Sequence, residues 1–178
     1  LVITISDENL ATSAATLSVG VGAYQDPSSA QGIAHFLEHM IFMGSDKYKD
    51  PNEYMQFISE NGGETNAFTA DQQTTYLFSI NSDKFEDALD RLSAAIKSPL
   101  FDGTMVEKEI NAVNSEWLLR RQSEAFIRQR TAAMTGNLNH PKTLLGVGNK
   151  ETLSSEKETL LKSLREFHKR YYSANIMK

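Results

Sequence analysis

The sequence of 178 residues contains no cysteine. Disulfide frameworks, thiol nucleophiles and cysteine-ligated zinc sites are therefore excluded together, because each of them needs a cysteine sulfur. The absence also fits a reducing compartment, and we expect the protein to be cytoplasmic. If the chain holds a catalytic metal ion, its ligands must come from histidine and carboxylate side chains.

Long apolar runs and an excess of positive charge are also missing. No apolar run approaches the ~18 residues that a transmembrane helix needs, so no membrane span is expected. The formal net charge is −5, which argues against nucleic acid as the main partner. No basic region precedes the first apolar residues, so no signal peptide is recognisable. Because the chain does not begin with methionine, we expect it to be a fragment of a longer protein.

The composition is that of a globular domain, with 40% apolar and 23% charged residues. No internal repeat, low-complexity tract or linker divides the chain, so we expect residues 1–178 to form a single domain. Alternating apolar residues predict strands over residues 1–5, 14–24, 65–70 and 74–81, the last two forming a hairpin. Apolar residues at helical spacing predict helices over 26–44, 50–61, 83–96, 104–134 and 155–172. This order predicts an α+β fold, with one mostly antiparallel sheet packed against helices.

The most informative segment is His35-Phe36-Leu37-Glu38-His39. Residues four apart on a helix lie on the same side, so both imidazoles can reach one metal ion, and Glu38 projects near the same point. Two imidazoles and a neighbouring carboxylate are what a hydrolytic zinc site requires, and the order H-x-x-E-H is a signature of inverted zinc peptidases. The alternative is one buried and one surface histidine beside a solvated glutamate. The apolar residues around them make that arrangement costly.

A catalytic zinc site also needs a third protein ligand. With no cysteine, and with only His140 and His168 left among the histidines, a carboxylate is favoured as this ligand. The long predicted helix offers Glu107, Glu109, Glu116 and Glu124. Glu109 and Glu116 lie seven residues apart on one face of that helix, so one can bind the metal while the other orients the site. Their spacing does not say which of the two does so. The alternative is that both are ordinary solvated glutamates.

The motif belongs to a series of segments that recur in the same order in one known family. They are residues 32–44 around the motif, Asn52-Glu53-Tyr54, Thr65-Asn66-Ala67-Phe68-Thr69, Ser98-Pro99-Leu100-Phe101, residues 109–116, Gly136-Asn137, His140-Pro141 and residues 148–153. In this order, and over nearly the whole chain, the sequence resembles the pitrilysin-type family of zinc metallopeptidases, and within it the insulin-degrading branch.

The resemblance implies a role for each polar residue of the site. His35 and His39 bind zinc, Glu116 is the third ligand, and Glu38 is the general base. Glu109 matches the family's second carboxylate, which supports the site from behind. The implied cofactor is one Zn²⁺ per chain, and the implied activity is endopeptidase cleavage of short to medium peptides.

The resemblance also implies where substrate binds. Asn66 and Ala67 fall in the family's edge strand, along which an extended peptide adds as a further strand. Phe42, Phe68 and Phe126 match pocket-lining positions, and the alternative for each is a place in the hydrophobic core.

Family members are much longer, and the donors that stabilise the tetrahedral intermediate come from their other half. The isolated chain is therefore expected to be poorly active, because losing one such donor typically costs ~10²–10³ in rate. The expected partners are peptide substrates and the remaining domains of the longer chain, and homo-oligomerisation of the full-length protein stays open. Two alternatives within the family also remain, a non-catalytic structural or activating homologue and a mitochondrial-processing-type presequence peptidase.

Overall fold

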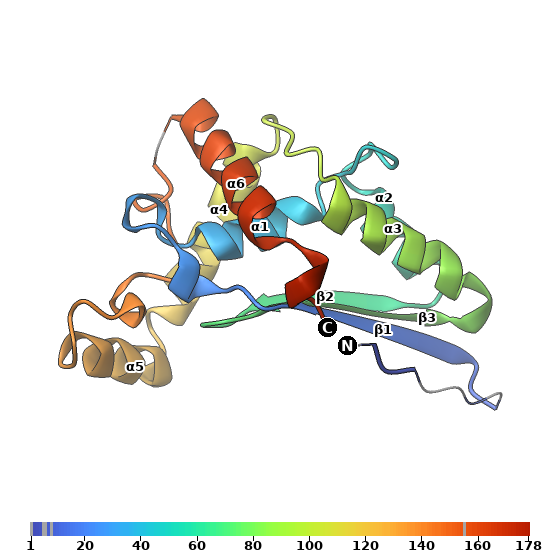
Figure 1. The fold of residues 1–178 in the computed structure, drawn as a ribbon, viewed down its shortest axis with the longest axis horizontal. Coiled ribbons are helices and arrows are strands. Elements are labelled where there is room, and N and C mark those ends of the chain that lie inside the picture. Colours follow the sequence, from blue (N-terminus) through green and yellow to red (C-terminus); the bar gives the residue numbers. More distant parts are fainter. Residues whose placement is uncertain (1, 5–6, 8, 155) are drawn as a thin grey trace.

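Three antiparallel strands form the sheet on which the fold is built (Figure 1). The computed structural model describes residues 2–4, 7, 9–154 and 156–178. The strands are β1 (Thr12–Val19), β2 (Glu64–Thr69) and β3 (Thr74–Asn81), in the order β1-β3-β2. The predicted hairpin is confirmed, with pairs from Glu64↔Ser79 to Thr69↔Thr74. Strand β3 is therefore central, and β2 lies at an edge.

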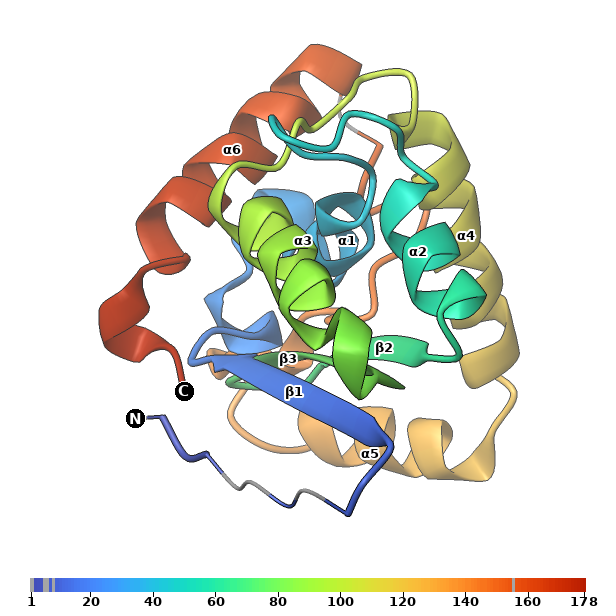
Figure 2. The same cartoon turned by 90° about the vertical axis from the view of Figure 1, so that its right-hand side faces the viewer.

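The helices gather mainly on one side of this sheet. They are α1 (Ile33–Ile41), α2 (Glu53–Glu60), α3 (Phe85–Lys97), α4 (Val106–Arg120), α5 (Glu124–Met134) and α6 (Lys157–Tyr171). Figures 1 and 2 show α1, α2, α3 and α6 on the same side of the strands, whereas α5 lies apart from them. The predicted α+β class, with one antiparallel sheet against helices, is confirmed. Among the described residues, no helix combines the length and hydrophobicity that a membrane crossing requires.

Helix α1 lies in the middle of the helical layer, in contact with the sheet, α4 and α6. Its apolar residues Ile33, Phe36, Leu37, Met40 and Ile41 have no exposed surface. His35 and Glu38 of the same helix are buried as well, at 5% and 8% exposure. The packing of α1 on all sides therefore places two polar side chains of the H-x-x-E-H motif inside the protein, where each needs a partner.

The start of α1 differs from its prediction, because the helix begins at Ile33 rather than near Asp26. Gly32 precedes it with a left-handed backbone, at φ +89°, which ends the short turn before the helix. Asp26 still serves the helix. Its Oδ2 accepts a hydrogen bond from the Gly32 N–H at 2.7 Å, and its Oδ1 accepts one from the Ala34 N–H at 3.0 Å. The buried carboxylate thus satisfies N–H groups that a helix start leaves without partners.

Two strand predictions were wrong in their extent. Val2 and Ile3 are 86% and 76% exposed and lie in no strand, while residues 1 and 5 lie outside the described residues. The alternating apolar pattern alone does not make a strand, because Val2 and Ile3 have no neighbouring strand to pair with among the described residues. The strand predicted over 14–24 ends at Val19, opposite Thr74, the first residue of β3. Beyond that point the chain turns over the hairpin tip, where the Ala23 N–H donates to the Ala70 carbonyl.

The prediction of one long helix over residues 104–134 was also wrong, because this segment forms two helices. Helix α4 ends at Arg120 and α5 begins at Glu124. Ser123 causes the second start, since its hydroxyl accepts a hydrogen bond from the Phe126 N–H at 3.2 Å as an N-cap. Helices α2 and α6 lie inside their predicted ranges, and α3 runs one residue beyond its own. Glu109 and Glu116 share α4, so their predicted common face is retained.

Candidate active site

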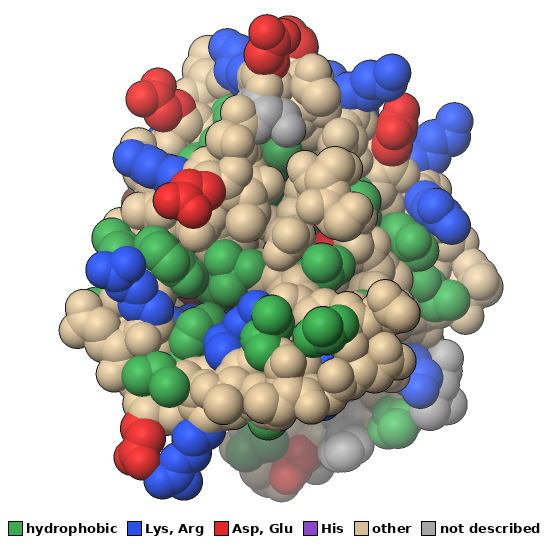
Figure 3. Space-filling model, turned by 90° about the vertical axis from the view of Figure 1, so that its left-hand side faces the viewer, with side chains coloured by type: hydrophobic (Ala, Val, Ile, Leu, Met, Phe, Trp, Pro, Cys, Tyr) green, Lys and Arg blue, Asp and Glu red, His purple; other side chains and the backbone are tan. Residues whose placement is uncertain are grey.

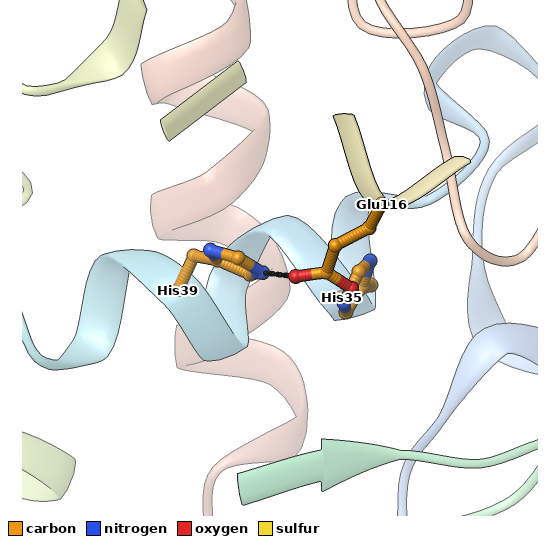
Figure 4. Close-up of side chains that lie close together, drawn as sticks. All are labelled: His35, His39 and Glu116. Atoms are coloured by element: carbon orange, nitrogen blue, oxygen red, sulfur yellow. Dashed lines mark ion pairs between the residues drawn. The ribbon is translucent and has the colours of Figure 1, made fainter. Parts of the chain in front are cut away.

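Three side chains from two helices converge beside α1 (Figure 4). His35 and His39 lie one turn apart on α1, with their rings edge to face at 4.9 Å. Glu116 reaches them from α4: its Oε2 lies 3.4 Å from His35 Nε2 and its Oε1 lies 3.2 Å from His39 Nε2. One ligand atom from each residue lies within 4.8 Å of the others. The arrangement supplies two imidazole nitrogens and one carboxylate to a single point.

The other ring nitrogen of each histidine is held by a separate group. His35 Nδ1 lies 2.8 Å from the Val147 carbonyl oxygen, which can only accept a hydrogen bond. In the neutral ring this assigns the proton to Nδ1 and leaves the Nε2 lone pair free on the side of Glu116. His39 Nδ1 lies 3.2 Å from Glu109 Oε2, a carboxylate with only 7% of its side chain exposed. The structure therefore separates the two glutamates that sequence spacing could not: Glu116 faces both Nε2 atoms, and Glu109 supports His39 from behind.

The charges of this cluster are strongly coupled. Burial alone would lower the pKa of His39, but the hydrogen bonds and charges of Glu109 and Glu116, with the charge of Glu38, raise that pKa to about 9. The imidazoles of His35 and His39, which face its two oxygens, hold the pKa of the Glu116 carboxyl well below its usual range. The metal-free cluster at neutral pH is thus an ionised carboxylate against a protonated His39.

Glu38 lies beside the three converging side chains, but its hydrogen-bond partner belongs to the sheet. Its Oε2 accepts a hydrogen bond from the Thr69 hydroxyl, at 2.6 Å. Thr69 is the last residue of β2, so the predicted base is linked to the sheet, whereas His39 is linked to α4. Glu38, which is 8% exposed, therefore has a polar partner without being drawn into the histidine–glutamate cluster.

These residues line an open cleft of about 480 Å³. One wall is the edge strand β2. Because the Ala70 N–H donates to Gln73 across the hairpin, the alternation of antiparallel pairs turns the N–H and C=O groups of Ala67 and Thr69 away from β3, toward the free edge. The Asn66 side-chain oxygen accepts a hydrogen bond from the Ala67 N–H at 2.9 Å. The predicted substrate strand is thus an edge strand, with main-chain groups directed outward.

The three predicted pocket phenylalanines have different surroundings. Phe42 is 6% exposed and stacks on Tyr54, so it belongs mainly to the core, although it also borders the cleft. Phe68 is 46% exposed and lines the cleft. Phe126 lines a second cavity of about 830 Å³ beside α5, which borders His35 as well. Figure 3 shows that hydrophobic and Lys or Arg side chains mingle on the face on which α5 lies.

Sequence reasoning missed some contributors to the site. Thr69 lies in one of the family segments, but a hydroxyl at a strand end gives no signal of its contact with Glu38. Val147 acts through its main-chain oxygen, which no side-chain pattern can indicate. Met43 and Met55 add apolar surface to the cleft. The functional roles of the predicted site residues stay predictions.

Comparison with known proteins agrees with this fold. Residues 1–146 match the family model described as Insulinase (Peptidase family M16). The chain is 44% identical over 179 residues to the A-factor-processing enzyme of Saccharomyces cerevisiae, covering 98% of this chain and 17% of that protein. It is 40% identical over 180 residues to human insulin-degrading enzyme, covering 99% and 18%. A solved crystal structure of pitrilysin superposes with a TM-score of 0.93 at 39% identity, covering 97% and 19%.

The chain therefore belongs to the insulinase family of peptidases, family M16, and the predicted resemblance is confirmed. It spans less than a fifth of the length of each of these relatives.

Proposed function

We propose that residues 1–178 form the zinc-binding catalytic domain of an endopeptidase that cleaves short to medium peptides. The observation that carries the proposal is the convergence of His35, His39 and Glu116 beside Glu38, in a cleft walled by an edge strand. The donor set fits zinc, because two imidazoles and one carboxylate are a known catalytic ligand set that leaves a position for water. The Nδ1 atoms of His35 and His39 are already held by the Val147 carbonyl and by Glu109, as metal-binding histidines require.

His35, His39 and Glu116 hold the ion in this proposal. A zinc ion in such a site polarises a carbonyl and lowers the pKa of water to ~7. Glu38 accepts a proton from the attacking water and delivers it to the leaving amine, which is general acid–base catalysis by one carboxylate. Glu109 holds His39 in its orientation through Nδ1.

The edge of β2 binds the peptide in the same proposal. An extended substrate displaces the Asn66 side chain from the Ala67 N–H and pairs with the outward main-chain groups of the strand. Main-chain pairing tolerates many sequences, and Phe68 with the methionines of the cleft offers apolar contact to a substrate side chain. We expect the 178 residues alone to be poorly active, because an oxyanion donor supplied from elsewhere is worth ~10²–10³ in rate. We also keep the cytoplasm as the expected compartment, which fractionation of cells tests.

Elemental analysis of the purified chain tests the metal site. We expect about one zinc per chain and loss of zinc from the His35→Ala/His39→Ala variant, because two of three ligands are then missing. His140→Ala is the matched control and should keep its zinc, since His140 contacts Tyr24 and the loop at Lys142, not the cluster. A wild-type chain with no more zinc than the double variant would contradict the proposal.

Hydrolysis by the parent polypeptide, meaning the natural protein that contains these residues, separates the remaining alternatives. Cleavage of short peptides supports the endopeptidase. Zinc without cleavage of any peptide indicates the non-catalytic homologue, and cleavage confined to long basic presequences indicates the processing peptidase.

Zinc affinity should depend on pH through His39. Its pKa of about 9 in the metal-free protein means that zinc must displace a proton at lower pH, because only the neutral imidazole binds metal. We expect the apparent affinity to rise about tenfold per pH unit from about pH 7 to 9 and then to level off. A pH series of chelator competition measures this slope, and a flat profile would contradict it.

The same raised pKa affects folding of the metal-free chain in the opposite direction. The stabilisation from protonated His39 is fully present below its unfolded pKa of 6.5 and is lost as the pH rises through about 9. The thermal unfolding midpoint of the metal-free chain should therefore fall over this interval, while zinc affinity increases.

A further inference from the structure

Thr69 occupies a position that neither the motif nor its ligands explain. It ends strand β2, and its hydroxyl lies 2.6 Å from Glu38 Oε2. Among the described residues, this is the one hydrogen bond that the Glu38 carboxylate makes. The one hydrogen bond of the predicted base therefore comes from the strand that the substrate is proposed to join.

The direction of this hydrogen bond follows from its surroundings. The Thr69 hydroxyl donates and Glu38 Oε2 accepts. The neighbouring Thr74 hydroxyl does not compete for this role, because it donates to the Val21 carbonyl at 2.9 Å and is fully buried. Thr74 Oγ1 lies 3.5 Å from Thr69 Oγ1, so the Thr69 side chain lies against a buried, hydrogen-bonded neighbour. The hydroxyl is thus held with its hydrogen directed at Glu38.

We propose that Thr69 is a positioning residue for Glu38, one that fixes the base and links it to the bound peptide. This inference rests on the proposed function. The hydrogen bond ties one carboxylate oxygen and leaves the other for proton transfer, so the side chain does not sample the alternative rotamers of a free glutamate. Misplacing a catalytic group by about 1 Å can cost ~10² in rate.

The backbone of Thr69 adds the link to substrate. Its N–H and C=O point to the free edge of β2, like those of Ala67, while its side chain contacts the base. A peptide that pairs along β2 therefore forms main-chain hydrogen bonds with the same residue that orients Glu38. Removing only the hydroxyl leaves these main-chain groups unchanged, so catalysis should suffer while substrate binding does not.

The test compares Thr69→Val with Thr69→Ser in the parent polypeptide. Valine keeps the shape and removes the donor, so kcat should fall about 10- to 100-fold while KM stays within about twofold. Serine restores the donor and should recover kcat to within about threefold of the unaltered protein. Thr75→Val is the matched control. It removes a hydroxyl of the same sheet that bonds Ser18 instead, and its kcat should stay within about twofold.

Two further readouts separate positioning from a structural role. Thr69→Val should keep about one zinc per chain, because its partner Glu38 is not among the proposed ligands. In a Glu38→Gln background, adding Thr69→Val should cause no further loss of kcat, whereas a structural defect would add its own loss.

Unchanged kcat in Thr69→Val, loss of its zinc, failure of serine to rescue, or additive losses would each overturn the inference and leave the peptidase proposal standing. An unaltered protein that cleaves no peptide would instead overturn the proposed function, and this inference with it.

Discussion

Replacing Glu38 by glutamine should abolish most peptide hydrolysis by the parent polypeptide without removing its zinc. General acid–base catalysis contributes about 10²–10⁴ in rate, and we expect kcat to fall by at least that factor. Glutamine has almost the same shape, and its side-chain oxygen can still accept the hydrogen bond from Thr69. The substitution therefore changes the capacity to take a proton and little else.

The distinction between base and ligand makes this experiment decisive. Glu38 is not among the three residues whose ligand atoms converge, so the zinc content should stay at about one per chain. Glu107→Gln, an exposed glutamate of α4, is the matched control and should keep both zinc and kcat. Full activity in Glu38→Gln would show that another group is the base, and loss of zinc would show that Glu38 binds the metal.

The part of the site that could be predicted from sequence lies on single helices. A helix places residues at i and i+4 on one side, so His35 and His39 had to lie side by side once residues 33–41 were helical. The same rule placed Glu109 and Glu116 on one face of α4, although the helix proved shorter than predicted. Their different contacts could not be foreseen, because those depend on how α4 packs against α1.

The missed parts join segments that are far apart in the chain. The Val147 carbonyl holds His35 from 112 residues away, and the Thr69 hydroxyl holds Glu38 from 31 residues away. Such contacts are set by tertiary packing, which local patterns do not encode. The break at Ser123 was also missed, even though serine is a strong N-cap signal, because helical spacing continued on both sides of it. Local periodicity thus predicted which elements exist better than where they end.

Substitution of Gly32 is the second change for which we expect a large effect, because its backbone contacts that of another glycine. Gly32 and Gly148 both have positive φ, at +89° and +71°. A Cβ on Gly32 would lie 2.3 Å from Gly148 Cα and 2.6 Å from Gly148 N, distances that only movement of the backbone can relieve. Val147, whose carbonyl holds His35, precedes Gly148 directly. The close approach of the two glycines therefore fixes the loop that orients a predicted zinc ligand.

Gly32→Ala should consequently weaken both the fold and the metal site. A non-glycine residue in the left-handed region costs about 1–2 kcal/mol, and overpacking typically adds 1–3, so we expect the free energy of unfolding to fall by about 3 kcal/mol. Loss of the partner that orients a metal-binding histidine typically costs 10–100-fold in metal affinity, and we expect a loss of that order. Chemical denaturation and chelator competition on the purified chain measure the two effects.

The control for this substitution is another glycine of the same chain. Gly136 is exposed, and a Cβ there would lie no closer than 3.6 Å to its neighbours, which is ordinary contact. Gly136→Ala should therefore change the unfolding free energy by less than about 0.5 kcal/mol and leave zinc affinity as it is. If Gly32→Ala lowered stability yet bound zinc normally, the loop at Val147 would have to tolerate the displacement. His35 would then be oriented mainly by its own helix and by Glu116, not by the carbonyl behind it.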